Sequence, residues 1–416
     1  AVGAQLINSM MAHVLVNLDG WTSAPVIQEL FSLRPGPVQL NFKGFAGTTG
    51  SDFIDYLVGD RVVTAPEYRQ YYTERLMFMP YSYHYNGHVH LYPPSTDVTI
   101  TRPNYGLPEN KFIFANFNQF YKLTPSYYDC WLRILQRVPD SHLWMLHWNV
   151  EAAQTLVKIA SERGIESSRF TFSDPFPQAK HVEIKGLADL FLDSAPYGAH
   201  GTAADAMYGG LPIVTCPRVL MASRVAASLS AASNSIDFIA HDLHEYEELA
   251  VLWSRRRRLL TQKHRTLRRL APSTMAFDSR RFVSNFVSGV IKTYELYLAG
   301  TPSHVIISDP LPTNDPPPAP EPTAPPPQRK PQAQPQAHRQ PQREREGERV
   351  GDGRDTWHIS AGSRSAPSRA PTQTSPPSWG TRPPPTPPTP PTRPTSSPPS
   401  VHGASIRSLL DRAQGD

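Results

Sequence analysis

The sequence predicts an α/β protein built on parallel sheets. Two short apolar runs, 111–117 and 189–196, each end in polar residues and lead into a segment with helical spacing. Six apolar runs of strand length alternate with segments of ordinary helix length between residues 111 and 239. This alternation is typical of a parallel sheet that helices cover on both faces.

The first part of the chain adds three short strands. Apolar runs at 12–18 and 37–42 are expected to be buried parallel strands, with a helix at about 23–33 between them, and 52–60 is expected to be a third strand. Three strands are few for a complete lobe. We therefore interpret residues 1–95 as the remnant of an amino-terminal lobe.

The second part, residues 96–300, is predicted to form one full lobe with closing helices. A polar, proline-marked connection at 92–110 precedes it. Its strands are expected at 111–117, 142–147, 169–173, 189–193, 211–215 and 235–239. Its helices are expected near 125–138, 150–163, 179–186, 201–208, 221–231, 244–271 and 278–298, the last of which should pack against the body through its apolar stripe.

Residues 301–416 are predicted to be a long, disordered, proline-rich tail. Of the 45 prolines, 28 lie after residue 300. Apolar periodicity is almost absent there, so the segment cannot bury enough surface to offset its chain entropy. Its Pro-x-x-Pro repeats, flanked by Arg382 and Arg393, suit SH3- or WW-type grooves. A plain spacer is the competing interpretation.

The composition limits the partners and the compartment. Two cysteines, Cys130 and Cys216, lie far apart and favour a reducing compartment over a disulfide framework. No apolar run approaches the length that spans a bilayer, so we expect no membrane partner. A reducing compartment is consistent with a cytoplasmic or nuclear location, which the family resemblance described below also implies. The net charge of +5 is mild. Because Arg255–Arg258 is best interpreted as a solvated helix face, with nuclear import or phosphate binding as the alternative, we infer no nucleic-acid partner.

Residues suited to phosphate binding follow two of the predicted strands. Lys122 comes five residues after the strand at 111–117, and His200, Gly201 and Thr202 open the helix after the strand at 189–193. Open α/β sheets bind ligands beyond the carboxyl ends of their strands, and helix starts favour anions. We therefore predict that these residues hold the diphosphate of a nucleotide-sugar without metal. The alternatives are a solvated lysine and plain N-capping by Thr202.

Further residues would complete such a site. Asp205, one turn into the helix, could take the ribose hydroxyls, or it could simply complement the helix dipole. His181, in a predicted loop, could contact the base, although a surface histidine is the competing interpretation. The glycine-rich loop 43–50 suits close passage of a sugar. A zinc site at the histidines is disfavoured because no cysteine accompanies His84, His88 and His90.

Several segments in order resemble the catalytic region of protein O-GlcNAc transferases, the two-lobed GT-B enzymes that move N-acetylglucosamine from UDP to serine or threonine. The similarity runs from about His13 to Gly300. It is carried by HVLVNLDGWT (13–22), LFSLRPGPVQ (30–39), GFAGTTG (44–50), YGLPENKFIFANFNQFYKLTP (105–125), ILQRVPDSHLWML (134–146), HVEIKGLADLFLD (181–193), HGTAAD (200–205) and ASRVAASL (222–229).

The resemblance implies a GT-B-type, two-lobed, Rossmann-like architecture whose first lobe is incomplete here. It implies inverting, metal-independent transfer from UDP-GlcNAc to protein Ser/Thr hydroxyls, with UDP-GlcNAc as a substrate and no cofactor. Lys122 and His200 would be the catalytic residues. The donor-binding residues would be Lys122 with Gln119 beside it on the diphosphate, His200, Gly201 and Thr202 on the phosphates, Asp205 on the ribose, His181 near the uracil and Gly44 facing the sugar.

The chain departs from the family pattern at several positions. Gly201-Thr202 stands where Thr-Thr is usual, Tyr197 replaces a small residue or cysteine, Lys43 replaces an apolar residue, and Gln178 and Ile184 replace basic residues. The family segment that carries a proposed catalytic histidine would lie upstream of Ala1. No general base is named, and His13 is a poor candidate because it should begin a buried strand.

Two other functions stay open at this point. One is a related SPINDLY-like protein O-fucosyltransferase that uses GDP-fucose; the loop 44–50 and His200 favour the first interpretation over it. The other is an inactive binding module whose function lies in the proline-rich tail.

Overall fold

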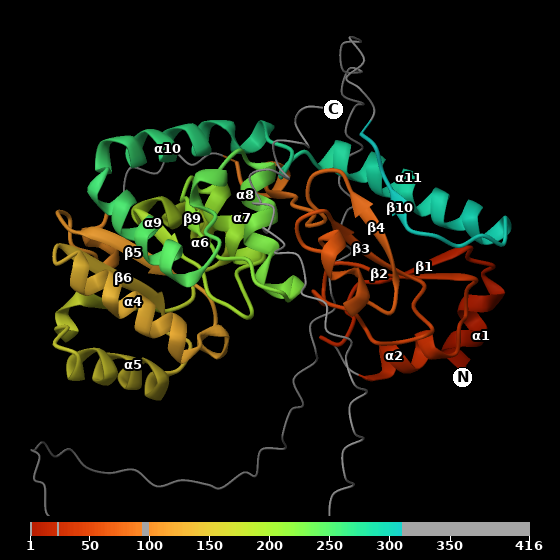
Figure 1. The fold of residues 1–416 in the computed structure, drawn as a ribbon, viewed down its shortest axis with the longest axis horizontal. Coiled ribbons are helices and arrows are strands. Elements are labelled where there is room, and N and C mark those ends of the chain that lie inside the picture. The colour runs from red at the N-terminus through yellow and green to blue at the C-terminus, as the bar shows by residue number, and fades with distance from the viewer. Residues whose placement is uncertain (1, 23–24, 94–99, 310–416) are drawn as a thin grey trace, which may run out of the picture. The chain divides into compact units, whose positions relative to one another are not determined.

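The computed structural model describes residues 2–22, 25–93 and 100–309. These residues contain two sheets of five strands each, and every strand pair is parallel. The α/β prediction is therefore confirmed (Figure 1). Most of the expected tail, residues 310–416 with Arg382 and Arg393, lies outside the described residues.

The first sheet has the order β1-β2-β3-β4-β10. Its strands are β1 (Val14–Asn17), β2 (Val38–Asn41), β3 (Tyr56–Asp60), β4 (Arg75–Met79) and β10 (Val305–Ile306). The three strands expected from the sequence are present, whereas β4 and β10 were not predicted. β1 was expected to be buried, but only its last residue is, because the strand forms one edge of the described sheet.

β10 also corrects the tail boundary at residue 301. Val305 and Ile306 pair with Met77 and Phe78 of β4, and Val305 is buried. Residues 301–309 therefore belong to the folded part. Helices of the first part are α1 (Val2–Ser9), α2 (Pro25–Ser32), the 3-10 helix η1 (Pro66–Tyr71) and α3 (His88–Leu91).

The second sheet has the order β7-β6-β5-β8-β9. Its strands are β5 (Phe112–Asn116), β6 (Ser141–Leu146), β7 (Phe170–Ser173), β8 (Leu190–Leu192) and β9 (Ile213–Val214). From β5 the chain first builds the sheet outward through β6 and β7, and then returns to place β8 and β9 on the other side. The strand order therefore reverses between β5 and β8, where doubly wound sheets open a ligand crevice.

The prediction of a sixth strand at 235–239 was wrong. The chain forms a short 3-10 helix, η7 (Ile236–Phe238), and a single bridge between Thr215 and Ile239. The other helices of this part are η2 (Pro103–Tyr105), η3 (Phe120–Lys122), α4 (Pro125–Arg137), α5 (Val150–Glu162), η4 (Ser167–Arg169), α6 (Gln178–Ile184), η5 (Lys185–Leu187), α7 (Gly201–Tyr208), η6 (Met221–Ser223) and α8 (Val225–Ala232).

The closing helices differ from the sequence expectation in two ways. The expected helix at 244–271 is two helices, α9 (Leu243–Arg255) and α10 (Arg257–Leu270), because the backbone of Arg256 leaves helical geometry at φ −93° and ψ 44°. After η8 (Ala271–Ser273), α11 (Ser279–Leu298) packs against β2, β4 and β10 (Figure 1). The closing helix thus contacts the first sheet, although it was expected within the 96–300 lobe.

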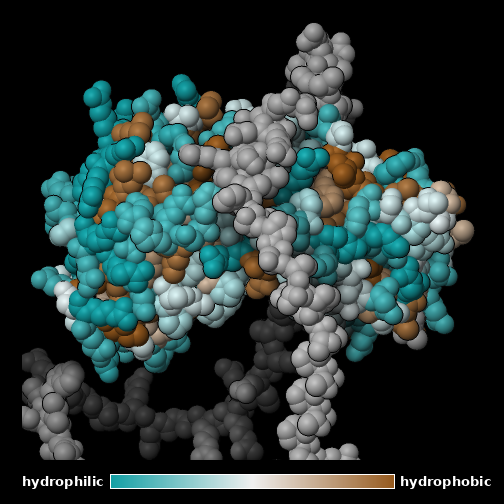
Figure 2. All heavy atoms as spheres, in the orientation of Figure 1, coloured by the Kyte–Doolittle hydropathy of each residue, from teal (hydrophilic) through white to brown (hydrophobic). Residues whose placement is uncertain are grey.

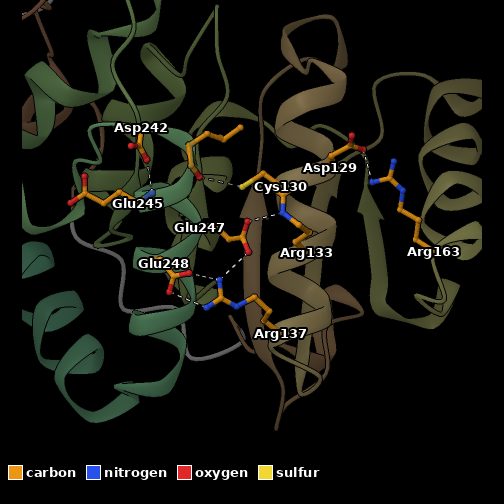
Figure 3. A network of polar contacts seen from close by, with 10 residues as sticks. Asp129, Cys130, Arg133, Arg137, Arg163, Asp242, Glu245, Glu247 and Glu248 are labelled. Atoms are coloured by element: carbon orange, nitrogen blue, oxygen red, sulfur yellow. Dashed lines mark hydrogen bonds and ion pairs between the residues drawn. The ribbon is translucent and has the colours of Figure 1, made fainter.

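Buried apolar strands, and ion pairs between helices α4 and α9, hold the second sheet and its covering helices together. All five residues of β5 and all six of β6 are buried, as expected for a sheet covered on both faces. On one face, Arg133 and Arg137 of α4 reach Glu247 of α9 at 2.8 and 2.9 Å (Figure 3). These contacts fix how α9 lies on the sheet that carries the candidate site.

The helix surface beyond α9 is polar. Arg255–Arg258 are exposed, which agrees with the solvated-face interpretation. On the face that Figure 2 shows, hydrophilic residues make up most of the surface around α10, and hydrophobic residues are scattered among them. Within the described residues, no helix combines the length and the apolar character that crossing a bilayer would require.

Candidate functional site

The two strand-to-helix junctions singled out in the sequence lie at the reversal point of the second sheet. η3, which ends at Lys122, follows β5, and the loop 193–200 follows β8. β5 and β8 are neighbours, paired through Phe114 with Leu190 and Ala115 with Phe191. The ammonium of Lys122 reaches across and donates to the carbonyl oxygen of Gly198 at 3.2 Å. The structure therefore brings both junctions together.

Tyr197 connects Lys122 with His200. The Lys122 Nζ lies 4.0 Å from the centroid of the Tyr197 ring, and the same ring stacks on His200 with centroids 4.8 Å apart. A cation over an aromatic face is held by the ring quadrupole. Tyr197 was noted in the sequence only as a departure from a family pattern, yet it touches both residues expected to be catalytic.

Asp193, at the end of β8, holds the loop that carries Tyr197 and His200. Its buried carboxylate accepts hydrogen bonds from the amides of Ser194 and Ala199 at 2.8 and 2.7 Å, and from the Thr215 hydroxyl at 2.8 Å. A Cβ on Gly198 would lie only 3.0 Å from Asp193 Oδ2, which leaves little room for a larger residue. An acidic residue directly after a buried strand was the one sequence signal for this role.

The local environment sets the charge of Lys122. Burial lowers the pKa of Lys122 to about 8, an effect that the carboxylate of Asp193 partly opposes. Lys122 is therefore mainly protonated at neutral pH. It can supply positive charge to an anion, although it is less strongly protonated than a solvated lysine.

His200 is neutral and already uses one ring nitrogen. Burial lowers its pKa to about 4. Its Nε2 lies 2.9 Å from the carbonyl oxygen of Ala222, so Nε2 carries the proton and donates there. The remaining Nδ1 has a lone pair, and it could donate to a phosphate only after taking up a proton. The expected direct contact between His200 and a phosphate stays a prediction.

The start of α7 offers better phosphate donors than the His200 ring. His200 is the N-cap residue, Gly201 is exposed, and a Cβ added to Gly201 would meet nothing within 4 Å. There is thus open space beside the first amides of α7 and the half-buried Thr202. Helix amides and a threonine hydroxyl in such a place suit an anion.

Asp205 is already paired in this structure. Its two carboxylate oxygens accept from His88 Nε2 at 2.8 Å and from Gln178 Nε2 at 3.0 Å, and the residue is 6% exposed. Burial alone would raise its pKa, but the His88 hydrogen bond and the charge of Lys185 hold the pKa below its ordinary value. A ribose would therefore have to replace or join Gln178. The ribose role stays a prediction.

The remaining candidates occupy different surroundings. His181 belongs to α6 and not to a loop, which corrects the expectation, and its Nε2 lies 2.6 Å from Lys185 Nζ. Gln119 is half-buried, and its backbone carbonyl oxygen accepts a hydrogen bond from the backbone amide of Lys122. A Cβ on Gly44 would lie 2.0 Å from the carbonyl oxygen of Leu18, so only glycine fits there.

Part of the site lines a cavity of about 600 Å³. Four predicted residues line it, Gly44, His200, Gly201 and Asp205, and so does Tyr197. Gln119, Lys122, His181 and Thr202 are not among its lining residues. Its volume lies within the range of small-molecule pockets.

Two other groups bear on the cavity. Lys43 lines it and donates to the carbonyl oxygen of Tyr85 at 2.7 Å. His84 and His88 pair with Asn86 and Asp205. In the part of the chain that the structure describes, no three His, Cys, Asp or Glu side chains are grouped so that they could hold a metal ion.

The model of glycosyl transferase family 41 matches residues 2–100 and 92–286. The chain belongs to this family. A protein of Arabidopsis thaliana, named as probable UDP-N-acetylglucosamine–peptide N-acetylglucosaminyltransferase SEC, is 35% identical over 305 residues. That alignment covers 72% of this chain and 31% of the relative. A UDP-N-acetylglucosamine–peptide N-acetylglucosaminyltransferase of Caenorhabditis elegans is 23% identical over 398 residues, with 70% and 34% covered.

A solved structure supports the fold of this family-41 chain. An O-GlcNAc transferase mutant of Thermobaculum terrenum superposes with a TM-score of 0.62 at 24% identity, covering 72% of this chain and 55% of that one. The described residues therefore have the fold of that structure, in agreement with the GT-B expectation. The chain spans about a third of the length of the curated relatives it matches.

Proposed function

We propose that this family-41 chain binds UDP-GlcNAc and transfers N-acetylglucosamine, with inversion, to Ser/Thr hydroxyls of proteins. The observation that carries the proposal is the meeting of Lys122, Tyr197 and the start of α7 at the reversal point of the second sheet. Family membership supplies the reaction class, and the relatives named as peptide N-acetylglucosaminyltransferases supply the substrates.

The proposal assigns tasks to Lys122, to the start of α7 and to Asp205. The Lys122 ammonium and the first amides of α7 hold the diphosphate, so the negative charge that grows on UDP as the sugar leaves meets positive groups already in place. The acceptor hydroxyl attacks the anomeric carbon and releases its proton to solvent. The bond from that carbon to the UDP oxygen breaks with its electron pair left on UDP, and the configuration inverts. Asp205 would take the ribose hydroxyls after Gln178 moves. Lys122 stabilises the negative charge that develops on UDP, and no metal is assigned a part in the reaction.

The donor is tested by comparing two sugar nucleotides. UDP-GlcNAc and GDP-fucose are titrated calorimetrically into the full chain and into Lys122→Met, with Lys111→Met as a control because Lys111 is exposed and pairs with Asp140. We expect UDP-GlcNAc to bind the wild type and the control alike, and Lys122→Met at least tenfold more weakly. Tighter binding of GDP-fucose would instead support the SPINDLY-like fucosyltransferase.

Transfer itself is tested with labelled UDP-GlcNAc and a Ser/Thr-containing peptide. Label on the peptide in the wild type, lost in Lys122→Met, supports the proposal. Donor binding without peptide labelling, in a longer protein that includes the upstream part of the family as well as in this chain, would favour a binding module.

A further inference from the structure

A lysine that the proposed reaction does not use lies fully buried beside the site. Lys185 is 0% exposed and directly follows α6. Its ammonium lies 2.6 Å from His181 Nε2 and 3.9 Å from the centroid of the Phe117 ring. A lysine is almost never completely buried without a specific partner. The contact with His181 is therefore the polar interaction that accompanies the burial of Lys185.

The other nitrogen of His181 has no partner. Its Nδ1 is buried and makes no hydrogen bond with any residue that the structure describes. A buried polar atom without a partner is costly, and in native proteins it commonly meets a water or a ligand. The Nε2 of His181 is thus bonded to Lys185, whereas its Nδ1 is without a partner among the described residues.

We propose that Lys185 is a positioning residue that fixes the tautomer of His181, so that the ring presents Nδ1–H to a carbonyl oxygen of the donor's nucleobase. The inference rests on the proposed function for the presence of a uridine nucleotide near His181. The tautomer itself follows from the residues of this chain alone. An ammonium has only donors, so it must donate to Nε2, and the single proton of the neutral ring then lies on Nδ1.

The charges around the pair agree with this assignment. Burial, and next the charge of Lys185, lower the pKa of His181 to about 4, so the ring is neutral near pH 7. Burial lowers the pKa of Lys185 to about 7, while the carboxylate of Asp205 on α7 opposes that shift. Asp205 is in turn bonded to His88 of α3. Near pH 7, Lys185 therefore changes between a form that can only donate and a form that can also accept.

The tautomer is read directly by ¹⁵N NMR of the full chain labelled in histidine, with the His181 signals assigned by their loss in His181→Asn. At pH 6 we expect Nδ1 of His181 to show the shift of a protonated nitrogen and Nε2 that of an unprotonated one. Lys185→Met keeps the length of the side chain and removes the donor, so the proton should move, wholly or in part, to Nε2. Lys158→Met, on the exposed surface of α5, is the matched control and should leave the spectrum unchanged.

The contact with the base is read by the affinity for UDP-GlcNAc, whose diphosphate has no proton to lose near neutral pH. We expect Lys185→Met to bind about tenfold more weakly than the wild type at pH 6, as the loss of one hydrogen bond predicts. The difference should shrink as the pH rises above about 7. His181→Phe should weaken binding to a similar extent, and the double variant should bind no more weakly than either single variant.

Several results would overturn the inference. They are a wild-type His181 with its proton on Nε2, an unchanged tautomer in Lys185→Met, or equal affinities of Lys185→Met and wild type at pH 6. A wild type with the expected tautomer that binds no uridine nucleotide would contradict the proposed function and the base contact, while it would support control of the tautomer by Lys185.

Discussion

The ammonium nitrogen of Lys122 lies 4.0 Å from the centroid of the Tyr197 ring, and that ring also stacks on His200. One aromatic side chain thus sets the position of a cation from one strand end and an imidazole from the next. Contacts within the chain thus hold the groups that we propose to bind the diphosphate, which would reduce the ordering that binding must accomplish.

The ring of Tyr197, and not its hydroxyl, is expected to matter for this arrangement. A cation–π contact contributes about 0.5–2 kcal/mol, so Tyr197→Leu should raise the Kd for UDP-GlcNAc about two- to thirtyfold. Tyr197→Phe keeps the ring and should bind nearly as the wild type does. Calorimetric titration of both variants is the measurement, and equal affinities for the two would contradict the assigned role.

Donor binding should depend on the protonation of Lys122. Because the pKa of Lys122 is lowered to about 8, the ammonium is charged below that pH and loses its charge above it. The affinity for UDP-GlcNAc should therefore fall as the pH rises through about 8. In Lys122→Met this fall should be absent. A wild-type affinity that stays constant from pH 7 to pH 9.5 would rule out a charged Lys122 on the diphosphate.

Turnover should suffer more than binding when Lys122 is replaced. Removing a group that stabilises charge in the transition state typically lowers kcat by about 10²–10³-fold. We expect a loss of this size for Lys122→Met in any form of the protein that transfers the sugar. Peptide labelling under saturating donor is the measurement. An unchanged kcat with a raised KM would show that Lys122 only binds the donor.

Burial of Lys185 should make stability rise with pH. The folded protein releases the Lys185 proton near pH 7, whereas the unfolded chain keeps it up to about pH 10.4. Between these values the unfolded state binds more protons, so this group makes the unfolding free energy increase as the pH rises. Urea unfolding at pH 7 and pH 9 checks this. Lys185→Met should lack this part of the increase, and a wild type and variant with the same pH dependence would show that Lys185 does not titrate in this range.

The polar contacts between α4 and α9 should stabilise the second sheet. The Glu247 side chain is 12% exposed and accepts from both Arg133 and Arg137 (Figure 3). Its removal leaves two guanidinium groups without their shared partner, so Glu247→Ala should lower the unfolding free energy by about 1.5–3 kcal/mol. Glu248, which is 48% exposed, is the control, and its alanine variant should be affected less. Equal losses in urea unfolding would contradict this account.

Strong local patterns allowed most of the fold to be predicted, and tertiary contacts decided the rest. The runs that form β5, β6 and β8 are continuous, buried and flanked by turn residues, and they were found from the sequence. The sequence of β4, Arg-Leu-Met-Phe-Met, lacks β-branched residues and gave no strand signal. β10 has two residues and exists through its pairing with β4. The alternating residues 235–239 looked like a strand but pair only through Ile239.

The candidate site shows the same division. The strand ends at Lys122 and His200 could be found because parallel strands bring their carboxyl ends to one edge of a sheet. Tyr197 and Lys185 could not, because their roles depend on burial and on ring contacts that exist only in the folded chain. Asp193 had only its place after a strand as a signal, and its partner Thr215 lies 22 residues away. The pairing of Asp205 with His88, 117 residues apart, was likewise beyond any local pattern.

A structure of the chain with UDP bound tests the central proposal most directly. The proposal predicts one diphosphate that accepts hydrogen bonds from Lys122 Nζ and from the first amides of α7 at the same time. A diphosphate that lies elsewhere, or that touches only one of the two strand ends while the other faces away from it, would contradict it.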